Sequence, residues 1–565
     1  MTKIAKDITR NLNKYSRVIT QNIENGAAQS MLYSLGLNKE DMKKPQVGVC
    51  SMWYKGNPCN SKLNILSNHV ANSVDKEKML SMNFNTIGIS DGISMGTKGM
   101  RYSLPSRDLI SDSIESVVNG LHYDSLICIP GCDKNLPGSV MAMSITDRPS
   151  FMIYGGSMRP TYLDDEYNKL DIVSSFEAYG KYINKEITNE KRQQIVESSC
   201  DKQCGSCSGL YTANTMAMIF ETMGLTLPNS SSSMSLSKEK INECSLAGET
   251  IYNLMKEDLR PSELINKKSF DNAIKMLYLT GGSTNAIIHL LAIAKVANVK
   301  LTLEDFTKHE NTPVLLNMKP HGINVMNDLY NIGGTSSFIK YLIESNLIDG
   351  NCLTITGNTL YENVREYPIL SQNQDVVFPK QYPFKSESHI KILKGNLAPE
   401  GCVSKISSDK GRNITKKAIV FNSEDEMMKS LKSHEIKKGN FVILRYQGES
   451  TGCPEMLKPT SALVGYFGNE APPLATDGRL SGGSHGILIC HLPDAYKENS
   501  ITSIIENDDI ITINLDKNSI TLNVEEEDVS NRLKSVIKPK LDIEIGYLSK
   551  FNRLVGGIDS GYSTY

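Results

Sequence analysis

Short, continuously apolar runs alternate with longer helical patterns between about residues 45 and 360. The runs at 47–51, 85–90, 126–129, 151–154 and 353–356 are predicted to be strands. Runs without polar alternation are typical of parallel strands buried on both faces. Helices are predicted over 109–119 and 212–224, and in the second Met216, Ile219, Phe220 and Met223 recur at helical spacing. This alternation predicts a doubly wound α/β structure.

The pattern changes after about residue 375. A polar, proline-containing segment at 371–389 is interpreted as a linker, and predicted strands follow at 389–393, 417–421, 441–446, 510–515 and 519–524. The last two strands alternate with a period of two around residues 516–518, which indicates a hairpin. We therefore predict an α/β N-terminal domain, a parallel sheet flanked by helices, over residues 1–380. A mainly β, barrel-like C-terminal domain is predicted over 381–565.

Charge and hydropathy indicate which kinds of molecule the protein binds. The 565 residues carry 61 Lys and Arg against 63 Asp and Glu, a net charge of −2. This balance argues against a nucleic-acid partner bound by bulk charge and against a membrane partner. The most apolar stretch, 286–299, contains His289 and Lys295 and is shorter than the ~20 residues of a membrane span. A small-molecule partner is expected instead.

The twelve cysteines are too sparse for a disulfide scaffold. The first seventeen residues contain no apolar core of the kind that a secretory signal has. A cytoplasmic, reducing setting is therefore expected, with import into an organelle left open. In that setting cysteines more often bind metals or take part in catalysis than form bridges.

Chemically reactive residues follow three of the predicted strands. Cys59 follows the first, Asp91 follows the second, and Cys132, Asp133 and Lys134 follow the third. Ligands bind beyond the carboxyl ends of parallel strands, so these side chains are expected to meet at one edge of the sheet. Any one of them alone is better explained as a buried small residue or a turn residue. Three such loops at one edge favour a metal site.

The densest cysteine cluster is Cys200, Cys204 and Cys207, directly before the predicted helix at 212–224. The positive end of a helix dipole favours a thiolate at Cys207, and thiolates bind soft metals and iron–sulfur clusters. The C-x3-C-x2-C spacing also occurs in radical S-adenosylmethionine enzymes, which stays open as an alternative. A four-thiolate zinc site is disfavoured because no second C-x2-C pair follows.

Two glycine-rich clusters lie in the predicted β domain. One precedes Glu455, and the other runs from Asp477 to Gly486 and contains Ser481. Glycine lets backbone amides approach an anion closely. These clusters therefore favour binding of an anionic group, with simple surface turns as the alternative.

Six ordered motifs together resemble one known family. They are NTIGISDGISMGTKGMRYSLPSRDLI, PGCDK, CGSCSGLYTANTM, GGSTN, PEMLKPTSAL and TDGRLSGGSHG. These motifs are similar to the dihydroxy-acid and phosphogluconate dehydratases, and NPCN, PGCDK and YTANTM resemble the [2Fe–2S] branch that acts on dihydroxy acids. The resemblance covers the chain from about residue 16 to the C-terminus. It implies an α/β domain, a β-barrel-like domain, a homodimer and a site between the two domains.

The resemblance also implies specific residue roles. Cys59, Cys132 and Cys207 match the ligands of a [2Fe–2S] cluster, whose open iron would act as a Lewis acid on the departing 3-hydroxyl. The residues that match Mg²⁺ ligands are Asp91, Asp133, Glu455 and Lys134, the last as a carbamate. Ser481 matches the base that removes the C2 proton, with His485 or Asp477 as the competing bases.

The activity implied is removal of water from 2,3-dihydroxy-3-methyl acids to give 2-oxo acids for valine and isoleucine synthesis. Departures from the family at Lys62, Cys204, Tyr330 and Cys453 bear on cluster nuclearity and substrate preference, and the roles of Cys200 and Cys204 stay open. The main alternative is a sugar-acid or phosphogluconate dehydratase of the same family. A radical enzyme and a non-catalytic metal sensor are the alternatives from other classes.

Overall fold

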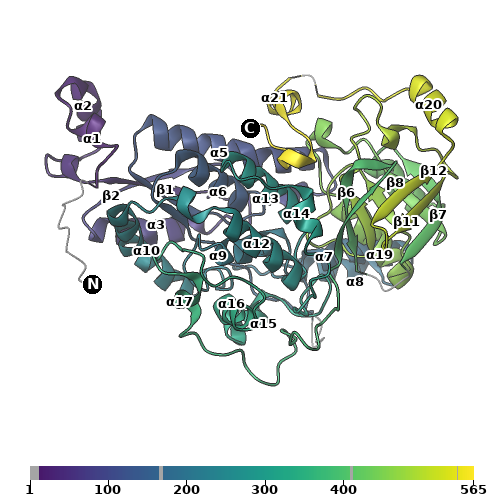
Figure 1. Cartoon of the computed structure of the whole chain (residues 1–565), viewed down its shortest axis with the longest axis horizontal. Helices are drawn as coiled ribbons and strands as arrows, with labels where there is room; N and C mark the ends of the chain where they lie inside the picture. The colour runs from purple at the N-terminus through teal and green to yellow at the C-terminus, as the bar shows by residue number, and fades with distance from the viewer. Residues whose placement is uncertain (1–11, 164–168, 408–411, 544) are drawn as a thin grey trace.

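The structure, a computed structural model, describes residues 12–163, 169–407, 412–543 and 545–565. It is elongated, with an α/β domain at one end and a β-barrel at the other (Figure 1). The N-terminal residues 1–11, part of the segment on which the question of organellar import depends, lie outside the described residues. Along the described parts of the chain, no helix combines the length and hydropathy that a membrane crossing requires.

The α/β domain is built on a parallel sheet in the order β2-β1-β3-β4. Its strands are β1 (Gln46–Ser51), β2 (Leu80–Asn85), β3 (Ser125–Ile129) and β4 (Ser150–Met152). All residues of β1, β3 and β4 are buried, because helices cover the sheet, whereas the edge strand β2 is partly exposed. The continuous apolar character of the first and third runs therefore reflects burial on both faces. The predicted fold class of this domain is confirmed.

Helices make up most of the rest of this domain. Their bounds are α1 Arg17–Thr20, α2 Gly26–Ser34, α3 Leu63–Lys76, α4 Asp91–Ser94, α5 Ser103–Gly120, α6 Asn135–Thr146, α7 Ile172–Ile183, α8 Asn189–Ser198, α9 Thr212–Thr222, α10 Lys238–Glu257, α11 Pro261–Leu264, α12 Lys267–Thr280, α13 Asn285–Val296, α14 Leu303–Thr307, α15 Met326–Asn331, α16 Gly334–Glu344 and α17 Leu360–Val364. Both helices predicted from the apolar spacing exist, as α5 and α9. Every residue of α9 is buried, so this helix lies within the core rather than on its surface. The most apolar stretch of the chain forms α13, which is buried from residue 285 to 294.

Two of the predicted strands are wrong. The strand that precedes Asp91 is β2, which ends at Asn85, and residues 86–90 form the loop after it. The backbone of this loop lies against another site loop, since a Cβ at Gly88 would meet the Asn60 amide at 2.4 Å, while its Ile87 side chain is exposed. Residues 353–356 form a turn with a single bridge between Leu353 and Thr359. There the β-branched residues of the run lead into the N-terminus of α17.

The C-terminal domain is a closed barrel in the order β10-β6-β5-β12-β11-β7-β8-β9. The strands are β5 Ile390–Gly395, β6 Ala398–Ile406, β7 Asn413–Phe421, β8 Asn440–Leu444, β9 Leu474–Thr476, β10 Ile487–Cys490, β11 Ile510–Asn514 and β12 Ser519–Asn523, and the helices are α18 Glu424–Lys432, α19 Leu457–Phe467, α20 Glu526–Ser535 and α21 Tyr547–Leu554. Parallel and antiparallel pairs both occur, and β11 and β12 form the predicted hairpin. Alternating residues such as Cys402, Phe441 and Ile511 fill its interior. The predicted mainly β, barrel-like architecture is confirmed.

Two segments tie the domains together. The polar segment 371–389 is not a free linker, because its Val377 and Lys385 form backbone bridges to residues 316 and 314 of the α/β domain. The last residues of the chain return from the barrel to the same domain. There the buried Arg107 guanidinium donates to the carbonyl oxygens of Gly561 at 2.9 Å and Tyr562 at 3.0 Å.

Candidate active site

The loops that follow the strands of the sheet pack directly on one another. Gly205 N donates to Pro58 O at 3.3 Å, and the Ser206 hydroxyl donates to Gly131 O. A Cβ at Gly131 would lie 2.5 Å from Cys59 O, so only glycine allows this approach. The structure thus brings together the loops of Cys59 and Cys132, as the parallel sheet predicts, and the loop of Cys207, which lies between α8 and α9.

Acidic side chains from both domains meet beside these loops. One carboxylate oxygen each of Asp91, Asp133 and Glu455 lies within 4.8 Å of the others. Asp91 begins α4, where the Ser90 hydroxyl caps the helix, and Asp133 lies two residues before the start of α6. Glu455 comes from the barrel domain and is fully buried. The arrangement of oxygen ligands suits a hard cation such as Mg²⁺.

Lys134 lies at the centre of this cluster and is 1% exposed. Its Nζ donates to Asp91 Oδ2 at 2.9 Å and to Glu455 Oε1 at 3.1 Å, and it lies 3.8 Å from Asp133 Oδ2. Lys134 is therefore not a lysine of a solvated loop. Lys134 joins carboxylates of both domains in a buried environment.

Three residues that hold this cluster were not singled out from the sequence. Asn285 and Arg479 donate to Glu455 Oε1 at 2.7 Å and 2.8 Å, and Ser103 Oγ donates to Asp91 Oδ1 at 2.7 Å. Asn285 ends the GGSTN motif and Arg479 lies in the glycine-rich TDGRL run. The sequence thus drew attention to both motifs but did not indicate that these two residues hold Glu455. The other oxygen, Glu455 Oε2, is buried without a hydrogen-bond partner among the described residues. This unpartnered oxygen fits a metal ligand.

The pKa values of two carboxyl groups in this cluster shift in opposite directions. Burial raises the pKa of Asp133 to about 7, with Lys134 opposing and Asp91 and Glu455 adding to the rise. Burial also acts to raise the pKa of Glu455, but Lys134 and Arg479 bring it below its ordinary value. The carboxylates outnumber the cationic groups in this cluster, and a bound divalent cation would compensate the excess negative charge.

The three cysteines form the neighbouring half of the site. A hydrogen bond to Cys132 and burial raise the pKa of the Cys59 thiol well above its ordinary value. Burial, with the charge of Asp133, likewise raises the pKa of Cys207. The thiolate expected at Cys207 from the helix dipole is therefore not favoured in the protein alone, since α9 begins only at Thr212. The raised pKa values of Cys59 and Cys207 fit a soft metal centre, which deprotonates its thiol ligands.

Cys200 and Cys204 lie in the same run as Cys207. Cys200 is exposed, whereas Cys204 is partly exposed, as Cys59 and Cys207 are, and has a left-handed φ of 67°. Burial therefore separates only Cys200 from the three predicted ligands. The roles of Cys200 and Cys204 stay unassigned.

Ser481 lies in a loop between the barrel and α9 and is 7% exposed. Its hydroxyl contributes to the lowered pKa of the Glu455 carboxylate, which places Ser481 beside the acidic cluster. A Cβ at Gly482 would meet Thr212 N at 2.5 Å, so glycine is required where the loop packs on the start of α9. Beside the loop, a hollow of about 370 Å³ is lined by residues of both domains, including His321 and His485.

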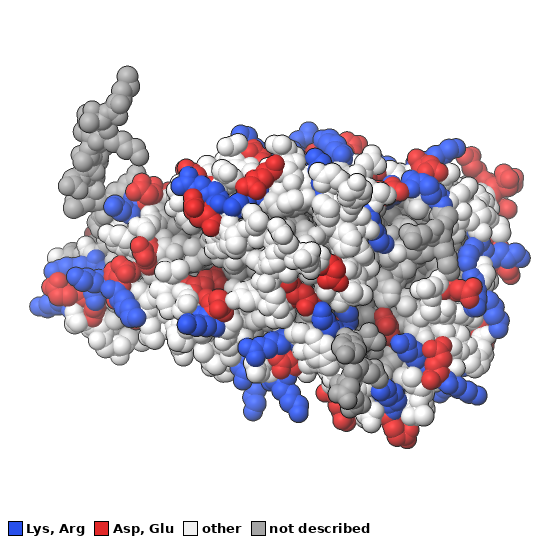
Figure 2. Space-filling view, turned by 90° about the horizontal axis from the view of Figure 1, so that it is seen from below, with Lys and Arg blue, Asp and Glu red and all other residues white. Residues whose placement is uncertain are grey.

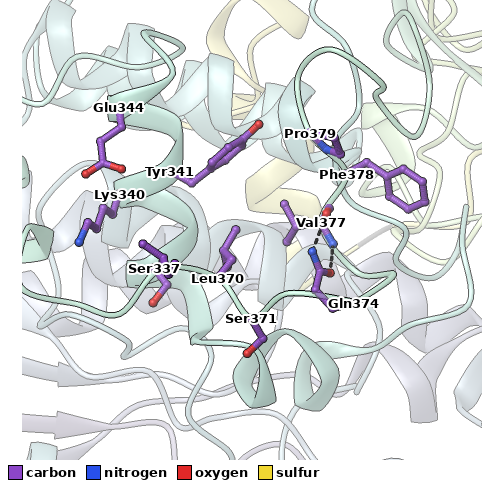
Figure 3. A pocket seen from close by; sticks show the side chains of 11 residues that line it. Ser337, Lys340, Tyr341, Glu344, Leu370, Ser371, Gln374, Val377, Phe378 and Pro379 are labelled. Atoms are coloured by element: carbon purple, nitrogen blue, oxygen red, sulfur yellow. Dashed lines mark hydrogen bonds between the residues drawn. The ribbon is translucent and has the colours of Figure 1, made fainter.

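Other surfaces carry none of the predicted site residues. A hollow of about 280 Å³ between α16 and residues 369–379 is mostly apolar, with Leu370, Val377 and Phe378 among its lining residues (Figure 3). On the face seen in Figure 2, positive and negative side chains are interspersed without a large patch of one sign. That distribution agrees with the near-zero net charge.

Comparison with known proteins defines the class of the protein. Residues 44–363 match the N-terminal domain and residues 375–562 the C-terminal domain of the dihydroxy-acid/6-phosphogluconate dehydratases. The protein is therefore a hydro-lyase of the metal-dependent dehydratase class. The chain belongs to the dihydroxy-acid/6-phosphogluconate dehydratase family.

Relatives resemble the chain over nearly its full length. Dihydroxy-acid dehydratase, mitochondrial, of Saccharomyces cerevisiae is 46% identical over 98% of this chain and 96% of its own length. The dihydroxy-acid dehydratases of Francisella tularensis subsp. novicida and Flavobacterium psychrophilum are 45% and 46% identical over 98% of this chain and 99% of their own lengths.

Proposed function

We propose that this protein is a dihydroxy-acid dehydratase that converts 2,3-dihydroxyisovalerate and 2,3-dihydroxy-3-methylvalerate to 2-oxo acids in valine and isoleucine synthesis. The observation that carries the proposal is the buried carboxylate–lysine cluster, built from both domains, beside three adjacent thiols. The names of the relatives support the choice of substrate over a sugar acid.

Two cofactors fit the donor sets. Cys59, Cys132 and Cys207 would hold a [2Fe–2S] cluster, and Asp91, Asp133, Glu455 and carbamylated Lys134 would hold Mg²⁺. When bound, these groups would supply Lewis acidity for the departing 3-hydroxyl and for the substrate carboxylate and 2-hydroxyl. The unpartnered Glu455 Oε2 and the hard oxygen donors favour Mg²⁺ at the carboxylates.

The residues of the chain perform the proton transfer. The Ser481 oxygen, as an alkoxide, takes the C2 proton, the C2–H electron pair forms the C2–C3 double bond, and the C3–O bond breaks. The hydroxyl leaves as water once it has received a proton, and the enol tautomerises to the 2-oxo acid. Arg479 and Asn285 hold Glu455 still beside Ser481, so the base keeps its position through the reaction.

The decisive experiment combines a visible spectrum with activity on two substrates. The protein purified under anaerobic conditions should absorb visible light and dehydrate 2,3-dihydroxyisovalerate much faster than gluconate. Faster turnover of gluconate or a phosphorylated sugar acid would favour the sibling dehydratase. Visible absorption without dehydration of either substrate would favour a radical enzyme or a sensor.

Replacing Ser481 by alanine tests its role as the base. Turnover should fall on the order of 10²-fold or more, the usual scale for loss of a general base, while the visible spectrum and substrate binding persist. Exchange of the C2 proton with deuterium should be lost as well. Steady-state kinetics and exchange measured by NMR check both expectations.

His485→Ala serves as the matched control for that test. His485 is partly exposed and pairs with Glu177 at 3.5 Å, so its loss should leave the exchange intact. The other competing base, Asp477, accepts hydrogen bonds from the backbone amides of Tyr446, Gln447 and Ala495, which suits a structural carboxylate. Retained exchange in Ser481→Ala together with its loss in His485→Ala would reassign the base.

Residues 23–37, here called the N-terminal arm, support the proposed homodimer. Helix α2 has no buried residue, and Ile23, Met31 and Leu35 are 93%, 70% and 71% exposed. Figure 1 shows α2 standing off the body at the end opposite the barrel. Nine residues are too few for a helix to persist in water without packing, and residues 26–37 contain no charged side chain. A second copy, always present at equal concentration, is the partner we assign to this apolar helix.

Leu35→Asp combined with Met31→Asp should shift the protein from dimer to monomer. Two charges in an apolar interface core cost several kcal/mol, enough to raise the dissociation constant roughly a thousandfold or more. Sedimentation at micromolar concentration measures the shift. Ile537→Asp is the control, since Ile537 is 93% exposed in the other domain. An unchanged dimer in the arm variant would exclude the arm from the interface.

A further inference from the structure

Lys405 places a fully buried amine against the Ser481 loop. The residue lies next to the end of β6 and is 0% exposed. It shares a strand face with Val403, which packs in the core between the domains, whereas Cys402 faces the barrel interior. The Lys405 side chain therefore points out of the barrel, toward the α/β domain.

The environment of this amine makes its presence costly. Its Nζ donates to Gly482 O at 2.9 Å, and within the described parts of the chain it forms no ion pair. Burial lowers the pKa of Lys405 to about 7, although Cys490 and Glu455 oppose the change. A methionine would fill the same space without the cost of burying an amine. A costly residue that stability does not require points to a role in function.

The hydrogen bond of Lys405 acts on the peptide group next to Ser481. The Gly482 carbonyl and the Gly483 N–H belong to one planar peptide group and point in opposite directions. The carbonyl accepts from Lys405, and the N–H donates to Ser481 Oγ over a long 3.5 Å. Between two glycines this peptide has little side-chain restraint against rotation. The lysine supplies the missing restraint.

We propose that Lys405 is a positioning residue for the dehydration, fixing the Gly482–Gly483 peptide so that its N–H faces the Ser481 oxygen. This inference rests on the proposed function, in which Ser481 acts as an alkoxide. Negative charge on that oxygen strengthens and shortens its hydrogen bond from Gly483. Donation from Lys405 at the other end polarises the same peptide and adds to that strength. The β6 strand thus stabilises the base through one peptide group.

Lys405→Met tests the proposal in the holoenzyme. We expect kcat to fall about 10- to 100-fold, since the loss of a direct oxyanion donor costs about 10²- to 10³-fold and this donor acts indirectly. KM should stay within about threefold, and the visible spectrum and melting temperature should not decrease. In a crystal structure of the variant, the Gly482–Gly483 peptide should rotate or adopt more than one orientation.

A double-mutant cycle separates positioning from a structural role. In the Ser481→Ala background, Lys405→Met should cost less than about twofold, because the oxygen on which it acts is gone. Lys240→Met is the matched control: Lys240 is also 0% exposed and donates to a backbone carbonyl, Ser230 O, at 2.8 Å, outside the site. Its kcat should stay within about twofold of the parent value.

Three results would overturn the proposal. They are a parent-like kcat in Lys405→Met, an equal fall in the Ser481→Ala background, and an unchanged peptide in the crystal structure of the variant. The crystal structure tests the restraint on the peptide independently of activity. An inactive parent enzyme would refute the proposed function alone, because the orientation of the Gly482–Gly483 peptide in Lys405→Met would still test whether Lys405 fixes it.

Discussion

Serine in place of Cys59, Cys132 or Cys207 is expected to abolish the visible absorption and the dehydratase activity together. The three loops that carry these cysteines pack on one another, so each thiol occupies a corner of a single buried site. A serine hydroxyl is a far weaker ligand than a thiolate for iron and does not deprotonate as readily. Loss of one ligand should therefore release the cluster. Absorption spectra, iron content and turnover of the three variants measure the effect.

Cys200→Ser and Cys204→Ser are the matched controls, since they change the same atom in the same segment of the chain. Cys200 is exposed, and Cys204 is partly exposed with a left-handed φ of 67°. Both variants should retain absorption and activity within about twofold, the usual outcome for surface substitutions. If Cys204→Ser lost the cluster while Cys59→Ser kept it, the ligands would be those of a radical enzyme.

Lys134→Arg is expected to lower Mg²⁺-dependent turnover by at least ~10³-fold. Arginine keeps the positive charge that joins Asp91 and Glu455, so the variant should fold. It cannot form a carbamate, in which the lysine nitrogen bonds to CO₂ and loses a proton. Without that anionic oxygen ligand the cation meets a guanidinium instead. The bound metal stabilises the transition state by several kcal/mol, and each 1.4 kcal/mol lost lowers the rate tenfold, which accounts for the ~10³-fold fall in turnover.

A direct measurement accompanies the kinetics. The parent protein supplied with ¹³CO₂ and Mg²⁺ should show a carbamate carbon signal in its NMR spectrum, and Lys134→Arg should lack it. Lys240→Arg controls for the substitution of a buried lysine elsewhere in the domain, because Lys240 is equally buried and pairs with Glu243. Near-normal activity of Lys134→Arg would refute the carbamate.

The fold could be predicted where the burial of an element determines the pattern of apolar residues in its sequence. Strands β1 and β3 are apolar throughout because helices cover both of their faces, and the hairpin of β11 and β12 alternates because one face lies inside the barrel. The run at 86–90 misled the prediction because its apolar side chains are not those of a buried strand, and Ile87 is exposed. There Gly88 O accepts the Asn57 amide at 2.9 Å, so the loop is shaped by contacts with other site loops.

The site could be predicted as far as strand order determines it. Cys59, Asp91 and Cys132 follow neighbouring parallel strands, so their proximity follows from the sheet alone. The second layer could not be derived in this way. Asn285 meets Glu455 only because the barrel docks on the α/β domain, a contact that joins residues 170 positions apart. Arg479 meets Glu455 within the barrel domain, through a bridge between two loops that lie outside the named strands. Local patterns contain no information about such a docking.

The return of the C-terminal residues to the α/β domain has a consequence for biosynthesis. Arg107 and Asp108 are buried early in the chain, yet their partners are Gly561, Tyr562 and Thr564. Domains generally fold in order as the chain emerges from the ribosome. Arg107 and Asp108 pair with each other at 2.8 Å, but the first domain cannot complete their remaining hydrogen bonds until residues 561–564 have been synthesised. Its core, and the carboxylate cluster that requires Glu455, are therefore completed only after the barrel domain has been synthesised.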